Sequence, residues 1–313
     1  METINKITTS KQTTMYDHLC KMIIGNEEVL SRIIKAAVDE ANHLNAEEIR
    51  RLIKGVHIGD LIVNPHFHLV DKKGFIKDEG MVYYDILCYI DVPQEDGKNI
   101  RVYLNVEIQN NPYPGYSIIT RGYAYVSRIV SEQWGSEYDD KNYDGMKKVY
   151  SLWIMSEAPK RKDGYMNVYE TNERIICGTT VEEKEIYDKG VILAIYLNKE
   201  HDLNKKYEEH DELLTPLMVL LNNVLDYKGK QRIIEEYGLN TKKIESEVKD
   251  ICDLGESIAL EARNEGKQIE CKEKNIEHVR KLMERLQMSF KEAVSLLEIP
   301  EKEVKEIEKY FQS

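Results

Sequence analysis

The sequence predicts an α/β fold, a central sheet flanked by helices, with a helical extension at the C-terminus. Two observations predict it. Apolar residues recur at helical spacing in some segments and alternate with polar residues in others, in the order helix, strands, helix, strand. Beyond residue 199 the chain becomes helical and highly charged. We therefore expect a domain at residues 1–199 and a charged helical region at residues 200–313.

The first part of the chain predicts helices. Residues 16–38 repeat apolar side chains at helical spacing, with a break near Gly25 that divides them into two helices. A further helix is expected at residues 45–54. There Asn45 is a suitable N-cap, and Glu48, three residues later, completes a capping-box pattern.

Strand patterns then recur along the chain, interrupted by a helical pattern at residues 115–134. The expected strands are residues 58–63, 67–71, 81–92, 100–109, 148–156, 167–170 and 191–197. An Asp-Gly pair separates residues 81–92 from residues 100–109, which predicts that these two strands form a hairpin. The continuous apolar run at residues 148–156 is typical of a buried strand.

The C-terminal region carries its own helix signals. Ser289 and Glu292 form a second capping-box pattern before a short helix, and Pro300 opens another helix. We expect a small helical bundle used in self-association, so a homo-oligomer is an expected assembly. A DNA-reading helix-turn-helix is the alternative, but its recognition helix would be acidic, which is unsuited to phosphates.

Composition and charge limit the function classes. Of 313 residues, 42% are hydrophobic and 32% are charged, with a net charge of −12, as in a folded protein with a charged surface. The longest apolar runs fall short of the roughly 20 residues of a membrane span, and the N-terminus lacks a signal-peptide core. We therefore expect a cytoplasmic protein outside the membrane, with its five scattered cysteines reduced. The acidic charge argues against nucleic acid wrapped over much of the surface, but not against a local basic cleft.

The expected hairpin carries a polar face. Along its second strand Glu107 and Gln109 alternate with apolar residues, so both side chains project from one face. If the hairpin is centred on residue 96, Asp85 lies directly opposite Glu107 on the same face. Two carboxylates then face each other beside an amide.

Facing carboxylates destabilise a sheet unless a cation lies between them. A divalent ion such as Mg²⁺ takes oxygen ligands, often one or two carboxylates together with water and substrate phosphate. We therefore expect Asp85 and Glu107 to hold Mg²⁺ or Mn²⁺, with Gln109 orienting the attacking water or a phosphate oxygen. The alternative is structural, with Asp85 a surface residue and Glu107 paired with a nearby arginine.

These segments, taken together, resemble a known family. The stretches YYDILCYI, VEIQNN, TRGYAYVSRI and KKVYSLWIM resemble the PD-(D/E)XK nuclease family transposases, relatives of the recombination-promoting (Rpn) nucleases. The resemblance covers roughly residues 16–200, and EVKDICDLGESIALEARNEGK is similar to the family's charged C-terminal helix. It implies a restriction-endonuclease-like core, with a mixed central sheet flanked by helices, and a metal-dependent DNA endonuclease.

The resemblance also assigns residues. Asp85 and Glu107 correspond to the metal-binding acids, and Gln109 stands where many relatives have a lysine. Replacing lysine by glutamine removes a positive charge that would stabilise the developing phosphorane, so the expected rate falls while metal binding is retained.

Two helices supply the remaining residues that the resemblance implies. Arg121 and Tyr125, one turn apart on one helix face, are expected to contact DNA, with Arg121 on a phosphate. An ion pair of Arg121 with the strand carboxylates is the alternative. Folds of this kind also use an acid from the first helix, and here Glu28 is preferred over Glu27. Both acids also suit a helix N-terminus, where they favour the macrodipole.

The sequence thus predicts a Mg²⁺- or Mn²⁺-dependent deoxyribonuclease that hydrolyses phosphodiester bonds in mobile-element or recombination DNA. Two rival interpretations remain. A catalytically weak descendant would bind DNA or assemble through its helical tail, as Gln109 and the acidic charge favour. A structural scaffold would have no nucleic-acid role and would bind neither metal.

Overall fold

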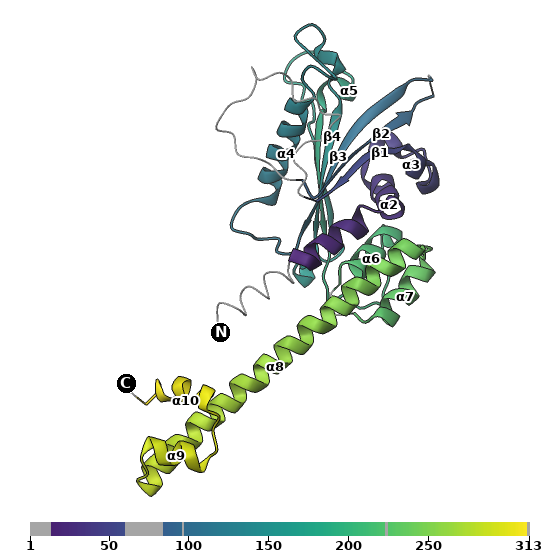
Figure 1. Cartoon of the computed structure of the whole chain (residues 1–313). Helices are drawn as coiled ribbons and strands as arrows, with labels where there is room; N and C mark the ends of the chain where they lie inside the picture. The colour runs from purple at the N-terminus through teal and green to yellow at the C-terminus, as the bar shows by residue number, and fades with distance from the viewer. Residues whose placement is uncertain (1–13, 60–83, 96, 223–224, 312–313) are drawn as a thin grey trace. The chain divides into compact units, whose positions relative to one another are not determined.

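A computed structural model describes residues 14–59, 84–95, 97–222 and 225–311 (Figure 1). The chain divides into two compact units, Met1–Cys252 and Asp253–Ser313. The first unit contains the sheet and extends past residue 199, because helices that follow the sheet pack against its core.

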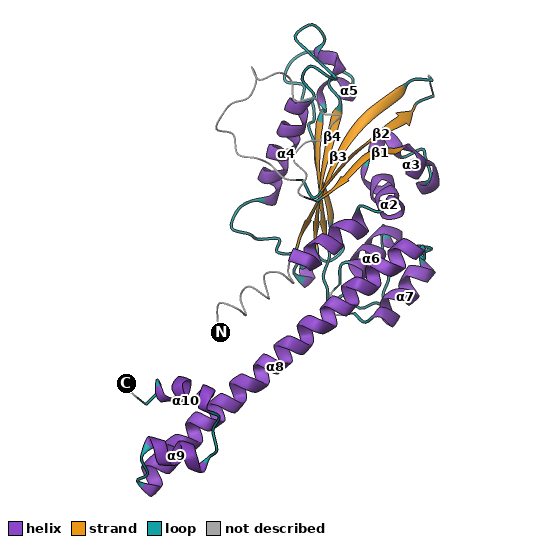
Figure 2. Cartoon of the chain, viewed as in Figure 1, coloured by secondary structure: helices purple, strands orange, loops and turns teal. Residues whose placement is uncertain are grey.

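The first unit is built on a mixed six-stranded sheet with the strand order β1-β2-β3-β4-β6-β5 (Figure 2). Its strands are β1 Ile53–Ile58, β2 Ile86–Pro93, β3 Asn99–Gln109, β4 Lys148–Met155, β5 Met166–Tyr169 and β6 Gly190–Tyr196. β3, β4 and β6 run parallel to one another, whereas β1, β2 and β5 pair antiparallel with their neighbours. The α/β class with a mixed sheet and flanking helices, expected from the sequence, is confirmed.

Helices cover both faces of this sheet. The first unit contains the helix of residues 14–24, α2 Glu27–Ala37, α3 Ala46–Leu52, α4 Ile118–Glu132, α5 Lys184–Tyr187, α6 Asp211–Leu220 and α7 Tyr227–Glu236. In Figure 1, α4 lies on one face of the sheet, and α2 and α3 lie on the other. Short 3-10 turns are found at Asp39–Ala41, Tyr143–Gly145 and Lys160–Lys162.

The helix starts follow the capping signals in the sequence. The helix of residues 14–24 ends before Gly25, and Asn26 caps α2 by accepting the backbone N–H of Glu28 at 3.0 Å. Asn45 and Glu48 form both hydrogen bonds of the expected capping box, at 2.8 and 3.0 Å. The expected helix break and the expected cap are therefore confirmed.

The β2–β3 hairpin has the expected register. Ile86 pairs with Val106 and Pro93 pairs with Asn99, so paired residues are equally distant from residue 96. This register fixes which residues of the two strands share a face.

The structure begins its sheet earlier than the sequence predicts. β1 starts at Ile53, inside the segment expected to be helical, because Ile53 and Lys54 pair with β2. Tertiary pairing here overrides the helical pattern of residues 45–54. The expected strand at residues 67–71, and most of the one at 58–63, lie outside the described residues.

The two faces of the sheet belong to different cores. Val102, Leu104 and Val106 of β3 face the larger core, which the helix of residues 14–24, α2 and α6 cover. Tyr103, on the alternate face, belongs to a smaller core under α4.

α4 approaches the sheet closely at Gly122. A Cβ atom there would lie 3.0 Å from Cγ2 of Ile192 and 3.1 Å from Nε1 of Trp153. The absence of a side chain therefore lets this turn of α4 lie directly on β4 and β6.

The second unit contains the end of α8 Lys242–Leu286, α9 Phe290–Leu296 and α10 Glu301–Glu308. Its apolar core is formed by Val279, Ala293, Val294, Ile299 and Ile307. Ser289 and Glu292 form the expected capping box at the start of α9. Across the described parts of the chain, no helix has the length and apolar character needed to span a membrane.

Candidate active site

Asp85 and Glu107 meet at one end of the β2–β3 hairpin. Asp85 directly precedes β2, and Glu107 lies near the carboxyl end of β3. The backbone N–H of Asp85 donates a hydrogen bond of 3.1 Å to Oε1 of Glu107. Glu107 is buried, with 4% of its surface exposed, and alternation along β3 places it on the α4 face. The structure thus brings together the two acids that the sequence predicts to be opposite.

A buried chain of hydrogen bonds orients Glu107. Nε1 of Trp153 donates to Oγ of Ser151 at 3.0 Å, and Oγ of Ser151 donates to Oδ1 of Asn105 at 2.9 Å. Nδ2 of Asn105 then donates to Oε1 of Glu107 at 2.7 Å. Asn105 and Ser151 are fully buried, and leaving their polar atoms unpaired there would be costly. The chain therefore holds the Glu107 carboxylate in one position.

Asp85 is bound by a lysine from the first described helix. Its Oδ1 lies 2.9 Å from Nζ of Lys21, and its Oδ2 accepts the backbone N–H of Ile108 at 2.9 Å. Lys21 also pairs with Asp17 one helical turn earlier, at 2.7 Å. Because Lys21 is only 8% exposed, solvent and salt screen this charge cluster weakly.

Burial and mutual repulsion alter the titration of the two acids. Burial, reinforced by the negative charge of Asp85, raises the pKa of Glu107 to about 8. Burial also raises the pKa of Asp85, although hydrogen bonds from the Ile108 N–H and from Lys21 oppose the change. Burial lowers the pKa of Lys21, but hydrogen bonds to Asp17 and Asp85 outweigh it, so the pKa lies above its ordinary value. The cluster therefore keeps a charged lysine on Asp85, while Asp85 and Glu107 together resist carrying two negative charges.

Arg121 and Tyr125 project from α4 into the same region. Arg121 donates hydrogen bonds to the hydroxyl groups of Tyr116, at 2.9 Å, and Tyr125, at 2.6 Å. Its guanidinium also lies 5.2 Å from the ring centroid of Trp153. The charge of Arg121 acts to lower the pKa of Glu107. Among the described contacts no ion pair joins Arg121 to either acid, so the alternative of a structural ion pair is not what the structure contains.

Gln109 lies two residues beyond Glu107 on the same strand face. It is half-buried at the end of β3. Within the described part of the chain its side chain makes no hydrogen bond, so it is not tied to the acid pair.

Glu28, the preferred first-helix acid, is bound elsewhere. It lies at the start of α2, where its Oε1 is 2.6 Å from Nη1 of Arg50 in α3. No contact between described residues joins it to the acid pair. The helical acid that the structure links to the pair is Asp17, through Lys21.

Sequence reasoning missed Lys21 and Ser151. A signal for Lys21 was present, because it interrupts the apolar run from Leu19 to Ile24 and lies one turn after Asp17. A lysine in such a run needs a buried partner. No comparable signal marked Ser151, whose role follows from the β3–β4 register that pairs it with Asn105.

The acid pair fits a hard divalent cation through its oxygen donors. Among the described residues no group of three or more His, Cys, Asp or Glu side chains is arranged to hold a metal ion. Mg²⁺, however, is often held by only one or two carboxylates, with water and phosphate completing the shell. The raised pKa of Glu107, about 8, reflects a surplus of buried acid that a cation would offset.

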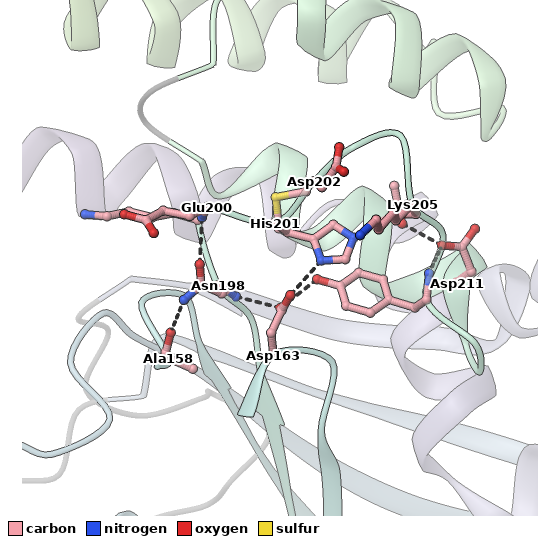
Figure 3. Close-up of polar contacts among 12 residues, drawn as sticks. Ala158, Asp163, Asn198, Glu200, His201, Asp202, Lys205 and Asp211 are labelled. Carbon is pink, nitrogen blue, oxygen red and sulfur yellow. Dashed lines mark hydrogen bonds and ion pairs between the residues drawn. The ribbon is translucent and has the colours of Figure 1, made fainter. Parts of the chain in front are cut away.

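A second polar cluster surrounds Asp163, in the loop between β4 and β5 (Figure 3). Its Oδ2 lies 2.6 Å from Nδ1 of His201, and its Oδ1 accepts the Tyr207 hydroxyl at 2.8 Å and the Asn198 N–H at 2.9 Å. His201 Nε2 lies 2.9 Å from the carbonyl oxygen of Lys205. The cluster joins the β4–β5 loop to the connection between β6 and α6, and partners meet the Asp163 carboxylate on both oxygens.

Comparisons of the chain with protein-family models, curated proteins and solved structures found no match. The resemblance to the PD-(D/E)XK nucleases therefore stays a prediction that rests on the motifs.

Proposed function

We propose that this protein is a metal-dependent nuclease that hydrolyses phosphodiester bonds in DNA. The observation that carries the proposal is that the buried Glu107 lies against the half-buried Asp85. The backbone N–H of Asp85 donates to the Glu107 carboxylate at 3.1 Å, and the Asp85 carboxylate binds Lys21 at 2.9 Å. Two acids kept together in a buried place cost stability, because burial and repulsion both disfavour their charged forms. Groups with strongly altered pKa values are a feature of sites that perform chemistry.

Asp85 and Glu107 are the residues that would hold Mg²⁺ or Mn²⁺. When bound, such an ion lowers the pKa of a water molecule and offsets negative charge on the scissile phosphate. Asn105 keeps the Glu107 carboxylate oriented through its 2.7 Å hydrogen bond, so the ligand is preorganised.

Lys21 supplies the positive charge that Gln109 lacks. Its ammonium lies 2.9 Å from Oδ1 of Asp85 and stays protonated, because the hydrogen bonds to Asp17 and Asp85 raise its pKa. An ammonium in this position stabilises negative charge that develops on the phosphate during attack. We therefore assign to Lys21 the role that the strand lysine has in relatives with E-x-K.

Arg121 is suited to a phosphate oxygen of the DNA. Two tyrosine hydroxyl groups and the face of Trp153 hold its guanidinium in place. No described acid neutralises it within ion-pair distance, so its charge is available to an anion. Tyr125 acts as a positioning residue, with its ring edge-on to Trp153 at 5.3 Å.

The order of elements supports a restriction-endonuclease-like core. The β2–β3 hairpin carries both acids, α4 follows it, and β4 returns parallel to β3. This is the order of strands and helix that the family resemblance implies.

The direct test is cleavage of a supercoiled plasmid by the purified protein with Mg²⁺, with Mn²⁺ and with EDTA. We expect nicking with either metal and none with EDTA, and we expect Asp85→Asn and Glu107→Gln to lower the rate roughly 10²- to 10³-fold. Asp140→Asn, which changes an exposed acid of the same unit, is the control and should cleave at the wild-type rate. Inert wild-type protein, or unimpaired cleavage by the two site variants, would overturn the proposal.

A binding or assembly module without catalysis is the second candidate. Two observations on the described residues favour it: the Gln109 side chain makes no hydrogen bond among them, and they contain no group of three or more metal-ligating side chains. This function predicts DNA binding, or self-association through the C-terminal helices, that persists when Asp85 is replaced.

A further inference from the structure

A strip of exposed tyrosines and basic side chains borders the candidate site. It consists of Tyr113, Tyr116, Arg161 and Lys162, and is called the tyrosine–lysine strip below. Tyr113 is 55% exposed and Tyr116 is 53% exposed. By contrast, Tyr125 of the neighbouring core is 6% exposed. The two tyrosines of the strip therefore contribute little to the core.

One end of the strip touches the site. The hydroxyl of Tyr116 accepts a hydrogen bond of 2.9 Å from Arg121, the guanidinium that lies over Trp153. Tyr116 and Tyr113 both belong to the loop that follows β3, the strand that carries Glu107. The loop thus leads directly from the acid pair to the strip.

The other end of the strip pairs aromatic rings with cations. Nζ of Lys162 lies 5.6 Å from the ring centroid of Tyr113 and 4.5 Å from that of Tyr196. Arg161, close to Tyr113, lowers the pKa of its phenol. Lys162 is therefore held over two ring faces, with a second cation beside Tyr113.

The strip is locally basic in an acidic chain. Lys160, Arg161 and Lys162 are consecutive, and none of them forms an ion pair with a described acid, although the net charge of the chain is −12. Uncompensated cations of this kind attract an anionic ligand.

We infer that the tyrosine–lysine strip binds single-stranded DNA and leads it to the Asp85–Glu107 pair. The inference rests on the proposed nuclease function and names the substrate class of that site. Every base offers a flat face that stacks on an aromatic ring, and every nucleotide places a phosphate near its base. The strip offers both kinds of contact, exposed tyrosine rings for the bases and cations for the phosphates.

Duplex DNA matches the strip less well. In a duplex the base faces are stacked on one another, so exposed tyrosines would meet only the backbone and base edges. A single strand, or a strand displaced from a duplex, leaves its bases free to stack. Unpaired DNA is therefore the expected ligand.

The test measures binding separately from cleavage. Fluorescence anisotropy of the full chain in EDTA would compare a labelled oligothymidine with a labelled duplex of the same length. We expect tighter binding of the single strand. Tyr113→Leu should weaken it on the order of tenfold through the lost stacking, and Lys162→Gln should reduce the salt dependence by about 0.7 in the log–log slope.

Tyr143→Leu and Lys141→Gln are matched controls, since both residues are exposed. Both controls precede β4, whereas Tyr113 follows β3. Because β3 and β4 are parallel, the controls lie at the amino ends of these strands and Tyr113 lies at the carboxyl end. Neither control should change binding.

Preference for the duplex, or equal weakening by Tyr113→Leu and Tyr143→Leu, would overturn the inference. Single-strand binding with the expected variant effects, but no cleavage in Mg²⁺ or Mn²⁺, would leave the binding assignment standing and reject the nuclease. Metal-dependent cleavage together with unaltered binding by Tyr113→Leu would support the nuclease and reject the assignment of the strip as the single-strand binding site.

Discussion

The Asp163 cluster and the Asp85–Glu107 pair are both polar, partly or fully buried and close to strand ends, yet they differ in how their charge is met. Asp163 accepts two hydrogen bonds on one oxygen and has His201 at 2.6 Å on the other. Glu107 is 4% exposed, accepts from Asn105 and Asp85, and lies beside a second acid.

The difference separates a structural cluster from a candidate site. Asp163, in the β4–β5 loop, is met by Asn198, His201 and Tyr207 of the connection between β6 and α6 (Figure 3), so its environment already satisfies a negative charge. Around Glu107, burial and Asp85 raise the pKa to about 8, so the environment disfavours the second negative charge. A cluster of polar residues is thus not in itself a site. The informative feature is a buried charge that the fold leaves incompletely compensated.

The largest effect should come from removing the cation of the acid pair. We expect Lys21→Gln to lower plasmid cleavage on the order of 10²-fold, because a preorganised charge at the phosphate is lost. Lys21→Arg should restore part of the rate, which a merely structural role would not require. Equal cleavage by Lys21→Gln and the wild type would place the lysine outside the chemistry.

The next largest effect should come from Asp163→Asn, and it should be on stability alone. Asp163→Asn should lower the free energy of unfolding by about 2 kcal/mol, because hydrogen bonds to a charged group are weakened. Urea denaturation would measure this change, with Asp140→Asn as a control within about 0.5 kcal/mol of the wild type. The folded Asp163→Asn protein should cleave DNA as the wild type does. Loss of cleavage in this folded variant would remove the distinction between the two clusters.

The smallest effect concerns the pH dependence of the metal-free protein. Because the pKa of Glu107 is raised to about 8 in the folded state, the folded state holds a proton that the unfolded state releases. The stabilisation linked to that proton is complete at acidic pH and is lost as the pH rises toward 8. Glu107→Gln should abolish this fall in the free energy of unfolding between pH 5 and pH 8, because the variant has no carboxyl group at this position to hold the proton.

Urea titrations in EDTA at a series of pH values would measure the Glu107 effect. Parallel pH profiles for the wild type and Glu107→Gln would show that the acid pair is not the source of the loss of stability with rising pH. Asp163→Asn serves as the comparison, since its profile should retain the wild-type fall above pH 5.

The sequence predicted what local patterns determine. The two capping boxes, at Asn45 and Ser289, are read from residues three apart, and the hairpin register follows from its centre at residue 96. That register was enough to place Asp85 opposite Glu107 before any tertiary contact was considered.

The residues that complete the site depend on tertiary packing and could not be found in this way. Lys21 reaches Asp85 from a helix more than sixty residues earlier in the chain, through a contact that no spacing rule encodes. Glu28 was preferred because the family resemblance implies an acid from the first helix, but in the structure it lies beside Arg50. The helix before the break reaches Asp85 through Lys21, which also pairs with Asp17.

The most direct test of the central claim is a measurement of Mn²⁺ binding by the protein without DNA. Calorimetry, or the electron paramagnetic resonance signal of the free ion, would measure this binding. The account predicts a Mn²⁺ site in the wild type that is lost in Asp85→Asn and Glu107→Gln and retained in Asp163→Asn. A wild type that binds no Mn²⁺, or site variants that bind it as the wild type does, would contradict the assignment of Asp85 and Glu107 as metal ligands.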